Sequence, residues 1–464
     1  MSRQLFGTDG IRGVAGHYPL DAATAHALGF ALGQWAQARQ QEKEPGVVIG
    51  PEVVIGMDTR ESGPWLAAQV AGGLIEAGVQ PRFAGLITTP GVAYLTRTRD
   101  FVAGIMISAS HNPYQDNGIK VFDHSGFKLP DSQELALEQT IFQALREGMS
   151  ATAASLTVDT SLDAAYVDFL ASTFLVSTMD QRLDGLNIVL DCANGAASEI
   201  AAPLFQRLGA NVTAIGCSPD GRNINLDCGA LHLDQLRKEV DRQKADLGIA
   251  FDGDADRCMM VSNSGKLIDG DAVLLIVGSA LKDQGKLPDD TVVSTVMSNL
   301  GVERALNDRG IQLIRTQVGD KYVLEEMIRR GAALGGEQSG HIIFPQHATT
   351  GDGMLTALRV LEIMRASGKT LDQLTAGLTT YPQILVNVKV AHKRPISELP
   401  SVQEAIREAE AGFEGKGRIL VRFSGTETLA RVMVEGEDLE KVHAVANRIA
   451  DLLRAELGTV LTSA

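Results

Sequence analysis

Cysteine, aromatic residues and long apolar runs are all scarce in this chain, and two of these shortages exclude whole classes of protein. Only 4 of the 464 residues are cysteine, and they lie far apart without a Cys-x-x-Cys pair, so we expect neither a zinc site nor a disulfide framework. The longest nearly continuous apolar run, Ala272 to Leu281, is about half of the roughly 20 residues that cross a bilayer. The N-terminal segment lacks an apolar core of signal-peptide length. We therefore expect a cytoplasmic protein with no membrane span.

Positive charge is also in deficit. Lys and Arg number 42 against 57 Asp and Glu, which gives a formal net charge of −15. This balance argues against nucleic acid or an anionic membrane as the main partner, because both attract basic proteins. The hydrophobic content of 44% and the charged content of 21% are typical of a folded globular chain, and the length predicts two to four domains. Any anionic ligand must be bound by positive charge that is concentrated locally.

Three stretches of the sequence repeat one pattern, in which an apolar-periodic helix ends at a glycine and is followed by a short apolar strand. This pattern is typical of βα units in a parallel sheet. The glycines that end the three helices lie too far apart for a solenoid repeat, so we expect three α/β domains of similar build. The stretches are 64–83, with its stop at Gly78; strand 187–191, helix 197–208 and strand 211–215; and strand 291–296, a helix to Arg309 and strand 311–314.

The C-terminal part of the chain follows a different pattern. Strands are predicted over 384–390, 419–423 and 429–435, and a long amphipathic helix over 438–457. This is the pattern of an α+β domain. We therefore predict α/β domains over 1–155, 156–262 and 263–380 with mixed sheets, and an α+β domain over 381–464.

Three aspartates, Asp252, Asp254 and Asp256, follow a predicted buried strand over 246–251 and alternate with small residues. Three carboxylates this close repel one another unless a cation lies among them, and an all-oxygen ligand set favours Mg²⁺ or Mn²⁺. An EF-hand is excluded because its sixth position would need glycine and its twelfth glutamate, where this chain has Arg257 and Asn263. The alternative is a solvated acidic turn, which the apolar strand leading into it makes less favourable.

Ser110 follows another short apolar strand, 105–107, within the sequence Ser-His-Asn-Pro. A hydroxyl at the carboxyl end of a strand lies where open α/β sheets bind ligands. The segment lacks both glycines of a hydrolase nucleophile elbow, so serine hydrolysis is a poor interpretation, and a simple capping turn is the alternative. Lys120 would add positive charge if its segment folds back toward the serine.

Two further loops carry chemistry. The glycine-rich loop 335–341 presents Glu337, Ser339 and His341, a set suited to recognising sugar hydroxyls, and it is not a Walker loop because no Gly-Lys-Ser/Thr follows. Segment 422–428 lies where a hairpin is predicted to turn, and its guanidinium, hydroxyl and backbone N–H groups suit a phosphate. Plain turns are the alternatives for both loops. The proposed phosphate ligands are Arg422, Ser424, Gly425, Thr426 and Arg431.

Taken together, these four sites predict phosphoryl transfer on a phosphosugar. The same motifs, with Phe6 to Gly13, resemble the five signatures of the α-D-phosphohexomutases in order over the whole chain, and they are most similar to the branch that acts on glucosamine phosphates. The resemblance implies four domains around a central cleft and Ser110 as a phosphoserine. It also implies one Mg²⁺ bound by Asp252, Asp254, Asp256 and a phosphoserine oxygen, with Glu337 and Ser339 reading the sugar. Arg422, Ser424, Gly425 and Thr426 would hold the phosphate that is not reacting.

The reaction that the resemblance implies is the interconversion of glucosamine 6-phosphate and glucosamine 1-phosphate, a step toward peptidoglycan precursors. It passes through a bisphosphorylated sugar, which also serves as the activator, and the protein is expected to be a monomer or homodimer. A positioned side chain must transfer the hydroxyl proton. The candidates, which the sequence does not rank as acid or base, are Lys120, Arg257, His341 and Arg12.

Some positions depart from the family pattern, and three alternatives stay open. Ala255 stands where glycine is common, which predicts that the backbone there needs no positive φ. Residues 53–56 nearly duplicate 47–50, for which we have no account. The alternatives are a phosphomannomutase or phosphoglucomutase of the same family, a phosphohydrolase that uses Asp252 as its nucleophile, and a non-catalytic phosphosugar-binding protein.

Overall fold

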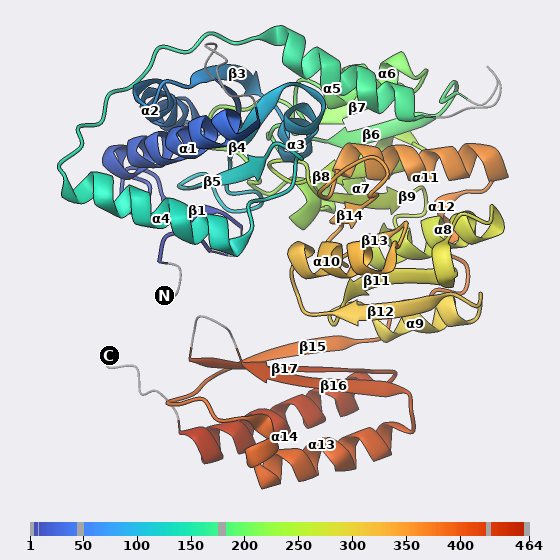
Figure 1. The fold of residues 1–464 in the computed structure, drawn as a ribbon. Coiled ribbons are helices and arrows are strands. Elements are labelled where there is room, and N and C mark those ends of the chain that lie inside the picture. The colour runs from blue at the N-terminus through green and yellow to red at the C-terminus, as the bar shows by residue number, and fades with distance from the viewer. Residues whose placement is uncertain (1–3, 8, 44–50, 175–181, 424–427, 459–464) are drawn as a thin grey trace. The chain divides into compact units, whose positions relative to one another are not determined.

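The computed structural model describes residues 4–7, 9–43, 51–174, 182–423 and 428–458 (Figure 1). Its contacts divide the chain into two compact units. The first unit comprises Met1–Val296 with Ile314–Ala376, and the second comprises Met297–Leu313 with Gly377–Ala464. Segment 47–50, the first copy of the near-duplication, lies outside the described residues, whereas the second copy belongs to a strand.

The N-terminal α/β domain contains a five-stranded mixed sheet. Its strand order is β1 (Ile11–Val14), β5 (Asp116–Asp123), β4 (Phe101–Ile107), β2 (Glu52–Met57) and β3 (Gln80–Leu86). Strands β3, β2 and β4 are parallel, whereas β5 and β1 are antiparallel to their neighbours. The associated helices are α1 (Ala22–Lys43), α2 (Gly63–Glu76), α3 (Thr89–Thr98) and α4 (Asp131–Arg146), and α5 (Thr160–Thr173) contacts both this domain and the next. Six of the seven residues of β4 are buried. A strand that is buried on both faces needs apolar residues throughout, and the sequence of β4 is accordingly a nearly continuous apolar run.

The second sheet repeats the arrangement of the first. Its order is β10 (Leu267–Ile268), β9 (Cys258–Ser262), β8 (Leu247–Phe251), β6 (Asn187–Asp191) and β7 (Asn211–Ile215). Strands β7, β6 and β8 are parallel, and β9 and β10 are antiparallel. Its helices are α6 (Ala201–Arg207) and α7 (Asp234–Gln243). In both sheets the chain leaves the last parallel strand through a loop and returns as an antiparallel strand.

The third sheet has four strands in the order β12 (Gln312–Thr316), β11 (Thr291–Thr295), β13 (Gly335–Gly336) and β14 (Ile342–Ile343). Strand β13 is parallel to β11 and antiparallel to β14, so the same step from a parallel to an antiparallel strand occurs a third time. The helices of this region are α8 (Gly270–Asp283), α9 (Leu300–Asn307), α10 (Asp320–Arg330), α11 (Gly353–Ser367) and α12 (Leu371–Leu374). The prediction of three similar α/β domains is confirmed.

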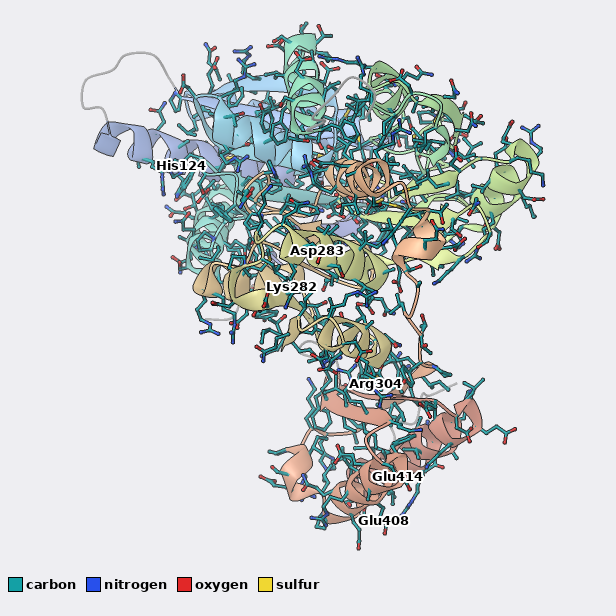
Figure 2. All side chains as sticks on the ribbon, turned by 90° about the vertical axis from the view of Figure 1, so that its right-hand side faces the viewer. His124, Lys282, Asp283, Arg304, Glu408 and Glu414 are labelled. Carbon is teal, nitrogen blue, oxygen red and sulfur yellow. The ribbon has the colours of Figure 1, made fainter. Side chains whose placement is uncertain are left out.

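The C-terminal domain is α+β, as predicted. Its antiparallel sheet has the order β15 (Gln383–Lys389), β17 (Leu429–Gly436) and β16 (Gly417–Phe423), and it is accompanied by α13 (Pro400–Phe413) and α14 (Leu439–Leu457). Residues from strands and helices share one core, including Val388, Val432, Val442 and Leu453. Charged side chains such as Glu408 and Glu414 are exposed on the outside of this domain, as Asp283 is on α8 (Figure 2).

Among the helices within the described residues, none is both long enough and apolar enough to cross a bilayer.

Candidate active site

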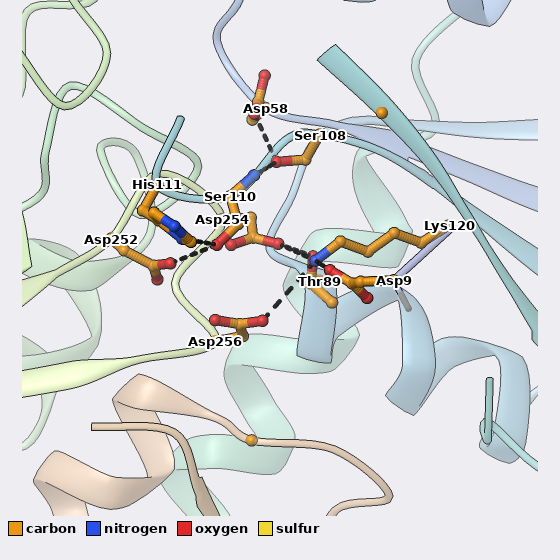
Figure 3. Close-up of polar contacts among 12 residues, drawn as sticks. Asp9, Asp58, Thr89, Ser108, Ser110, His111, Lys120, Asp252, Asp254 and Asp256 are labelled. Carbon is orange, nitrogen blue, oxygen red and sulfur yellow. Dashed lines mark hydrogen bonds and ion pairs between the residues drawn. The ribbon is translucent and has the colours of Figure 1, made fainter. Parts of the chain in front are cut away.

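Ser110 and Asp252 occupy equivalent places in the first two sheets, each in the loop after the last parallel strand. The Ser110 hydroxyl donates a hydrogen bond of 2.7 Å to Asp252 Oδ2 (Figure 3). Both side chains are buried. The two loops also meet through their backbones, because a methyl group on Gly253 would lie 2.5 Å from the carbonyl oxygen of Ser110. A serine and an aspartate 142 positions apart in the chain therefore share one site.

The three aspartates of the second loop form a compact group that fits a divalent cation. Each offers a carboxylate oxygen within 4.8 Å of the others, and all three are buried. Within the described part of the chain, Asp254 Oδ1 and Asp256 Oδ1 are buried without a hydrogen-bond partner. Burial raises the pKa of Asp252 well above its usual value, and Asp256 and Asp254 add to this effect. A bound cation would oppose that shift by stabilising the ionised carboxylates.

One expectation about this loop is wrong. Ala255 adopts a φ of 55°, in the left-handed region, although the alanine predicted a backbone without positive φ. The turn is held by neighbouring backbone bonds, because Ala255 N donates to Asp252 O at 3.0 Å and its carbonyl accepts from Gly353 N at 3.0 Å. These contacts offset the cost of the left-handed conformation for a residue with a Cβ atom.

Lys120 lies on a strand and beside the three aspartates. It belongs to β5, which pairs with β4, and its Nζ lies 2.8 Å from Asp254 Oδ2 and 3.1 Å from Asp9 Oδ2. Burial lowers the pKa of Lys120, but the charges of Asp254, Asp9 and Asp256 outweigh burial and hold the pKa above its usual value. The side chain is therefore a fixed cation next to the candidate metal site.

His341 extends this charged network on the other side. Its Nδ1 lies 3.6 Å from Asp256 Oδ2, and its Nε2 lies 3.7 Å from Asp320 Oδ2. Burial lowers the pKa of His341 while Asp256 and Asp320 raise it, with a net rise. The Gly351 N–H acts against protonation, since it donates to Nε2 at 2.9 Å and requires a lone pair there. This directional bond favours a neutral ring that carries its proton on Nδ1, facing Asp256.

The remaining candidates of the first unit lie around the same group. Arg257 directly follows the third aspartate, and its backbone N–H donates to Asp252 Oδ1 at 3.1 Å. Arg12, on β1, pairs with Asp9 at 2.5 Å. Glu337 Oε1 accepts from Gly319 N at 3.1 Å, and Ser339 Oγ lies 3.4 Å from Glu337 Oε2.

The proposed phosphate ligands belong to the second unit. Arg422 on β16 and Arg431 on β17 are directly opposite one another in the antiparallel register. Burial lowers the pKa of Arg422, and the charge of Arg431 lowers it further. Ser424, Gly425 and Thr426 lie outside the described residues. The two facing guanidinium groups form a concentration of positive charge that suits an anion.

Sequence reasoning missed several residues of this site. Lys128 Nζ bridges Asp9 and Asp320 at 2.6 Å from each, and the Thr89 hydroxyl donates to Asp254. Asp9 is part of the N-terminal motif, so its position was a signal that could have been used. Lys128 and Thr89 gave no signal, because nothing in their local sequence shows which distant residues they contact.

All four domain models of the phosphoglucomutase/phosphomannomutase family match the chain. The α/β/α domain I matches residues 3–147, domain II residues 164–265, domain III residues 269–381, and the C-terminal domain residues 385–452. The chain therefore belongs to this family of phosphohexomutases, which are metal-dependent enzymes.

Two relatives that match this chain over nearly its full length are named phosphoglucosamine mutases. A phosphoglucosamine mutase of Solibacter usitatus (strain Ellin6076) is 58% identical over 99% of this chain and 100% of its own length. Another, of Koribacter versatilis (strain Ellin345), is 50% identical over 98% of each chain. Among solved structures, a phosphoglucomutase/phosphomannomutase family protein of Burkholderia thailandensis has the same fold, with a TM-score of 0.77, 24% identity and 98% coverage of both chains. The N-acetylphosphoglucosamine mutase of Aspergillus fumigatus, in complex with GlcNAc-6P and magnesium, has a TM-score of 0.65 at 19% identity, covering 97% of this chain and 96% of its own.

Proposed function

We propose that this protein interconverts glucosamine 6-phosphate and glucosamine 1-phosphate through a phosphoserine at Ser110 and a bisphosphorylated sugar. The observation that carries the proposal is the buried hydrogen bond between the Ser110 hydroxyl and Asp252, one of three clustered aspartates. Full-length identity of 58% to a phosphoglucosamine mutase supports the choice of the amino sugar. We further propose 1–155, 156–262, 263–380 and 381–464 as the four functional domains.

Asp252, Asp254 and Asp256 would hold one Mg²⁺, with an oxygen of the phosphorylated Ser110 as a further ligand. Mg²⁺ prefers oxygen ligands, and when bound it offsets negative charge on the transferring phosphoryl group. The Lys120 cation lies 2.8 Å from Asp254 and contributes positive charge to the same place. Phosphoryl transfer depends mainly on such positioning and electrostatic stabilisation.

In the proposed half-reaction, a hydroxyl of the sugar attacks the phosphorus of phosphoserine 110. The new P–O bond forms on the sugar, the bond to Ser110 Oγ breaks, and the serine oxygen takes up the proton that the sugar hydroxyl loses. Lys120, Arg257, His341 and Arg12 are the proposed candidates for transferring this proton. The bisphosphorylated sugar then turns round, so that its other phosphate returns to Ser110.

The sugar and its second phosphate would be held by residues outside the metal loop. Glu337 and Ser339 offer a carboxylate and a hydroxyl that can exchange hydrogen bonds with sugar hydroxyls. Arg422, Ser424, Gly425, Thr426 and Arg431 would bind the phosphate that is not reacting. Since the sugar turns round between half-reactions, these ligands must accept a phosphate at either end of the molecule.

Intact-mass measurement tests the phosphoserine. Wild-type protein incubated with glucosamine 1,6-bisphosphate and Mg²⁺ should gain one phosphoryl group, and Ser110→Ala should gain none and lose mutase activity. A phosphohydrolase that uses Asp252 would keep substantial activity in Ser110→Ala. A non-catalytic binding protein would gain no phosphoryl group and show no turnover, and either result contradicts the proposal.

The substrate is tested separately by comparing kcat/KM for glucosamine, glucose and mannose 1-phosphates. We expect the amino sugar to give the highest value. A rate tenfold or more higher on glucose or mannose 1-phosphate would assign the protein to the phosphoglucomutase or phosphomannomutase branch instead.

A further inference from the structure

The backbone of Ser110 has a conformation that needs external support. Its φ is 52°, in the left-handed region that residues with a Cβ atom seldom adopt. Such conformations persist only where surrounding contacts hold them, and they concentrate at functional sites. The contacts from Arg60, Ser108 and Asn225 act on the backbone carbonyl and N–H of Ser110 and not on its hydroxyl.

Arg60 provides most of these contacts. Its guanidinium is fully buried, and it donates to the carbonyl oxygens of Ser110 and Asn112 at 2.9 Å each. It also donates to the carbonyl oxygen of Asp116 at 2.9 Å and to that of Pro113. One planar group therefore binds four carbonyl oxygens within the seven residues 110–116.

Asp58 and Ser108 complete a closed set of bonds around the same loop, of which Figure 3 shows the bonds of Ser108 to Asp58 and to Ser110. Arg60 Nε donates to Asp58 Oδ2 at 2.9 Å, and the Ser108 hydroxyl donates to the same oxygen at 2.6 Å. The Ser108 oxygen in turn accepts from the Ser110 N–H at 2.9 Å. Both the N–H and the carbonyl of Ser110 are thus tied to the Arg60–Asp58 pair.

Asn225 reaches the same carbonyl from the second domain. Its Nδ2 donates to the carbonyl oxygens of Ser110 and Asn112 at 3.0 and 3.1 Å. Its own N–H donates to Ala193 O at 2.8 Å, in the loop that follows β6. The Ser110 carbonyl is therefore held from both domains, while its hydroxyl faces Asp252.

We propose that Arg60 and Asn225 are positioning residues that hold the Ser110 backbone in its left-handed conformation, so that the serine oxygen stays directed at Asp252. The inference rests on the proposed role of Ser110 as the phosphoryl carrier. Neither residue touches the reacting atoms, and both act through the Ser110 and Asn112 carbonyls. Positioning of a reacting group affects the chemical step more than ground-state binding of the sugar.

Two variants and one matched control test this proposal. Asn225→Ala removes two hydrogen bonds to the loop and leaves no buried charge unpaired. Arg60→Lys keeps the charge but loses the planar fork, so a lysine cannot bind all four carbonyls. The control is Asn299→Ala, which removes another buried asparagine, whose side chain bonds Tyr381 and Gly301 in the second unit.

The measurements are kcat, KM for the sugar phosphate, the rate at which Ser110 gains a phosphoryl group from glucosamine 1,6-bisphosphate, and the melting temperature. We expect kcat and the phosphorylation rate to fall together, about 10-fold in Asn225→Ala and about 100-fold in Arg60→Lys, with KM within twofold of wild type. Asn299→Ala should keep the wild-type kcat despite a comparable loss of melting temperature.

An unchanged kcat in Asn225→Ala, or an equal loss of kcat in Asn299→Ala at the same loss of stability, would overturn the proposal. If Arg60→Lys does not fold, Asn225→Ala decides the question alone. If the proposed function itself is wrong, the result is distinguishable, because the wild-type protein would then gain no phosphoryl group.

Discussion

Asp352 is a buried carboxylate whose ionisation should affect stability. It caps α11, where Oδ1 accepts from Leu355 N at 2.9 Å and Oδ2 accepts from the Tyr166 hydroxyl at 2.8 Å. Burial raises its pKa to about 6, only partly offset by these bonds. Because the folded pKa lies above the unfolded value of 3.8, the folded state binds the proton more tightly.

The stability that this proton contributes is complete below about pH 4 and is lost as the pH rises through about 6. Asp352→Asn keeps an N-cap and cannot ionise, so its free energy of unfolding should rise relative to wild type over this window, by up to about 3 kcal/mol. Urea unfolding at pH 4, 5, 6 and 7 measures the difference. A difference that does not change with pH for Asp352→Asn would contradict the assigned pKa.

The predicted residues that lie together in the structure share one property: each reactive side chain occurs in a recognisable local sequence. The three aspartates follow an apolar strand, and Ser110 precedes a proline that ends its turn. Lys128 and Arg60 have no such context, since the ion pairs of Lys128 and the carbonyl contacts of Arg60 are with residues far away in the chain. The conformation of Ala255 was predicted wrongly. An alanine makes positive φ locally unfavourable, but backbone hydrogen bonds to Asp252 and Gly353 hold the residue in that conformation.

Helices α1 and α2 pack closely because glycines lie at their contact. A methyl group on Gly29 would lie 2.0 Å from Val70 O, and one on Gly73 would lie 2.0 Å from His26 O. Gly29→Ala should therefore destabilise the protein by about 2 kcal/mol, since overpacking costs up to about 3 kcal/mol and helix propensity returns about 1. Gly412→Ala on the exposed surface of α13 has no atom nearer than 3.7 Å and should be neutral or stabilising. Urea unfolding compares the two, and equal stabilities would show that the helices can separate without cost.

Strands β16 and β17 carry a pair that is unfavourable for stability. Arg422 and Arg431 are directly opposite, and like charges in this position destabilise a sheet by a fraction of a kcal/mol. Arg422→Gln should therefore raise the free energy of unfolding slightly. It should also raise KM about tenfold, which corresponds to the loss of one charged hydrogen bond to the phosphate, and leave kcat unchanged. Lys416→Gln removes the same charge from the exposed turn between α13 and β16 and should leave KM unchanged. A fall in kcat at constant KM would contradict a role for Arg422 in holding the non-reacting phosphate.

Local periodicity predicted the bounds of strands well where the apolar pattern covers the whole strand. Strands β6 and β7 have the predicted bounds, 187–191 and 211–215. The helix predicted from 197 begins only at Ala201, because the preceding residues form a loop in which Ala193 and Asn194 have positive φ and Ala196 N donates to Gly253 O. The equivalence of the Ser110, Asp252 and Glu337 loops, each between a parallel and an antiparallel strand, depends on strand pairing that periodicity does not encode.

The chain as a whole is strongly acidic, with a net charge of −15, yet it is proposed to bind an anionic sugar phosphate. Positive groups must therefore be concentrated near the site, and Lys120 and Lys128 meet this need while paired with Asp9, Asp254 and Asp320.

The three metal-loop aspartates lie in the first compact unit only. Divalent cations should consequently stabilise the two units unequally.

Mg²⁺ at 100 times its dissociation constant should stabilise the unit that binds it by about 2.7 kcal/mol, since a ligand of the folded state shifts the unfolding equilibrium by mass action. Hydrogen exchange followed by mass spectrometry measures this locally. Amides of β8 that exchange through unfolding of their unit should slow about 100-fold with Mg²⁺, whereas those of α14 should change far less. Asp254→Asn removes one ligand without changing the size of the side chain, and it should abolish the slowing in β8. Equal slowing in wild type and Asp254→Asn would mean that the cation binds somewhere other than the three aspartates.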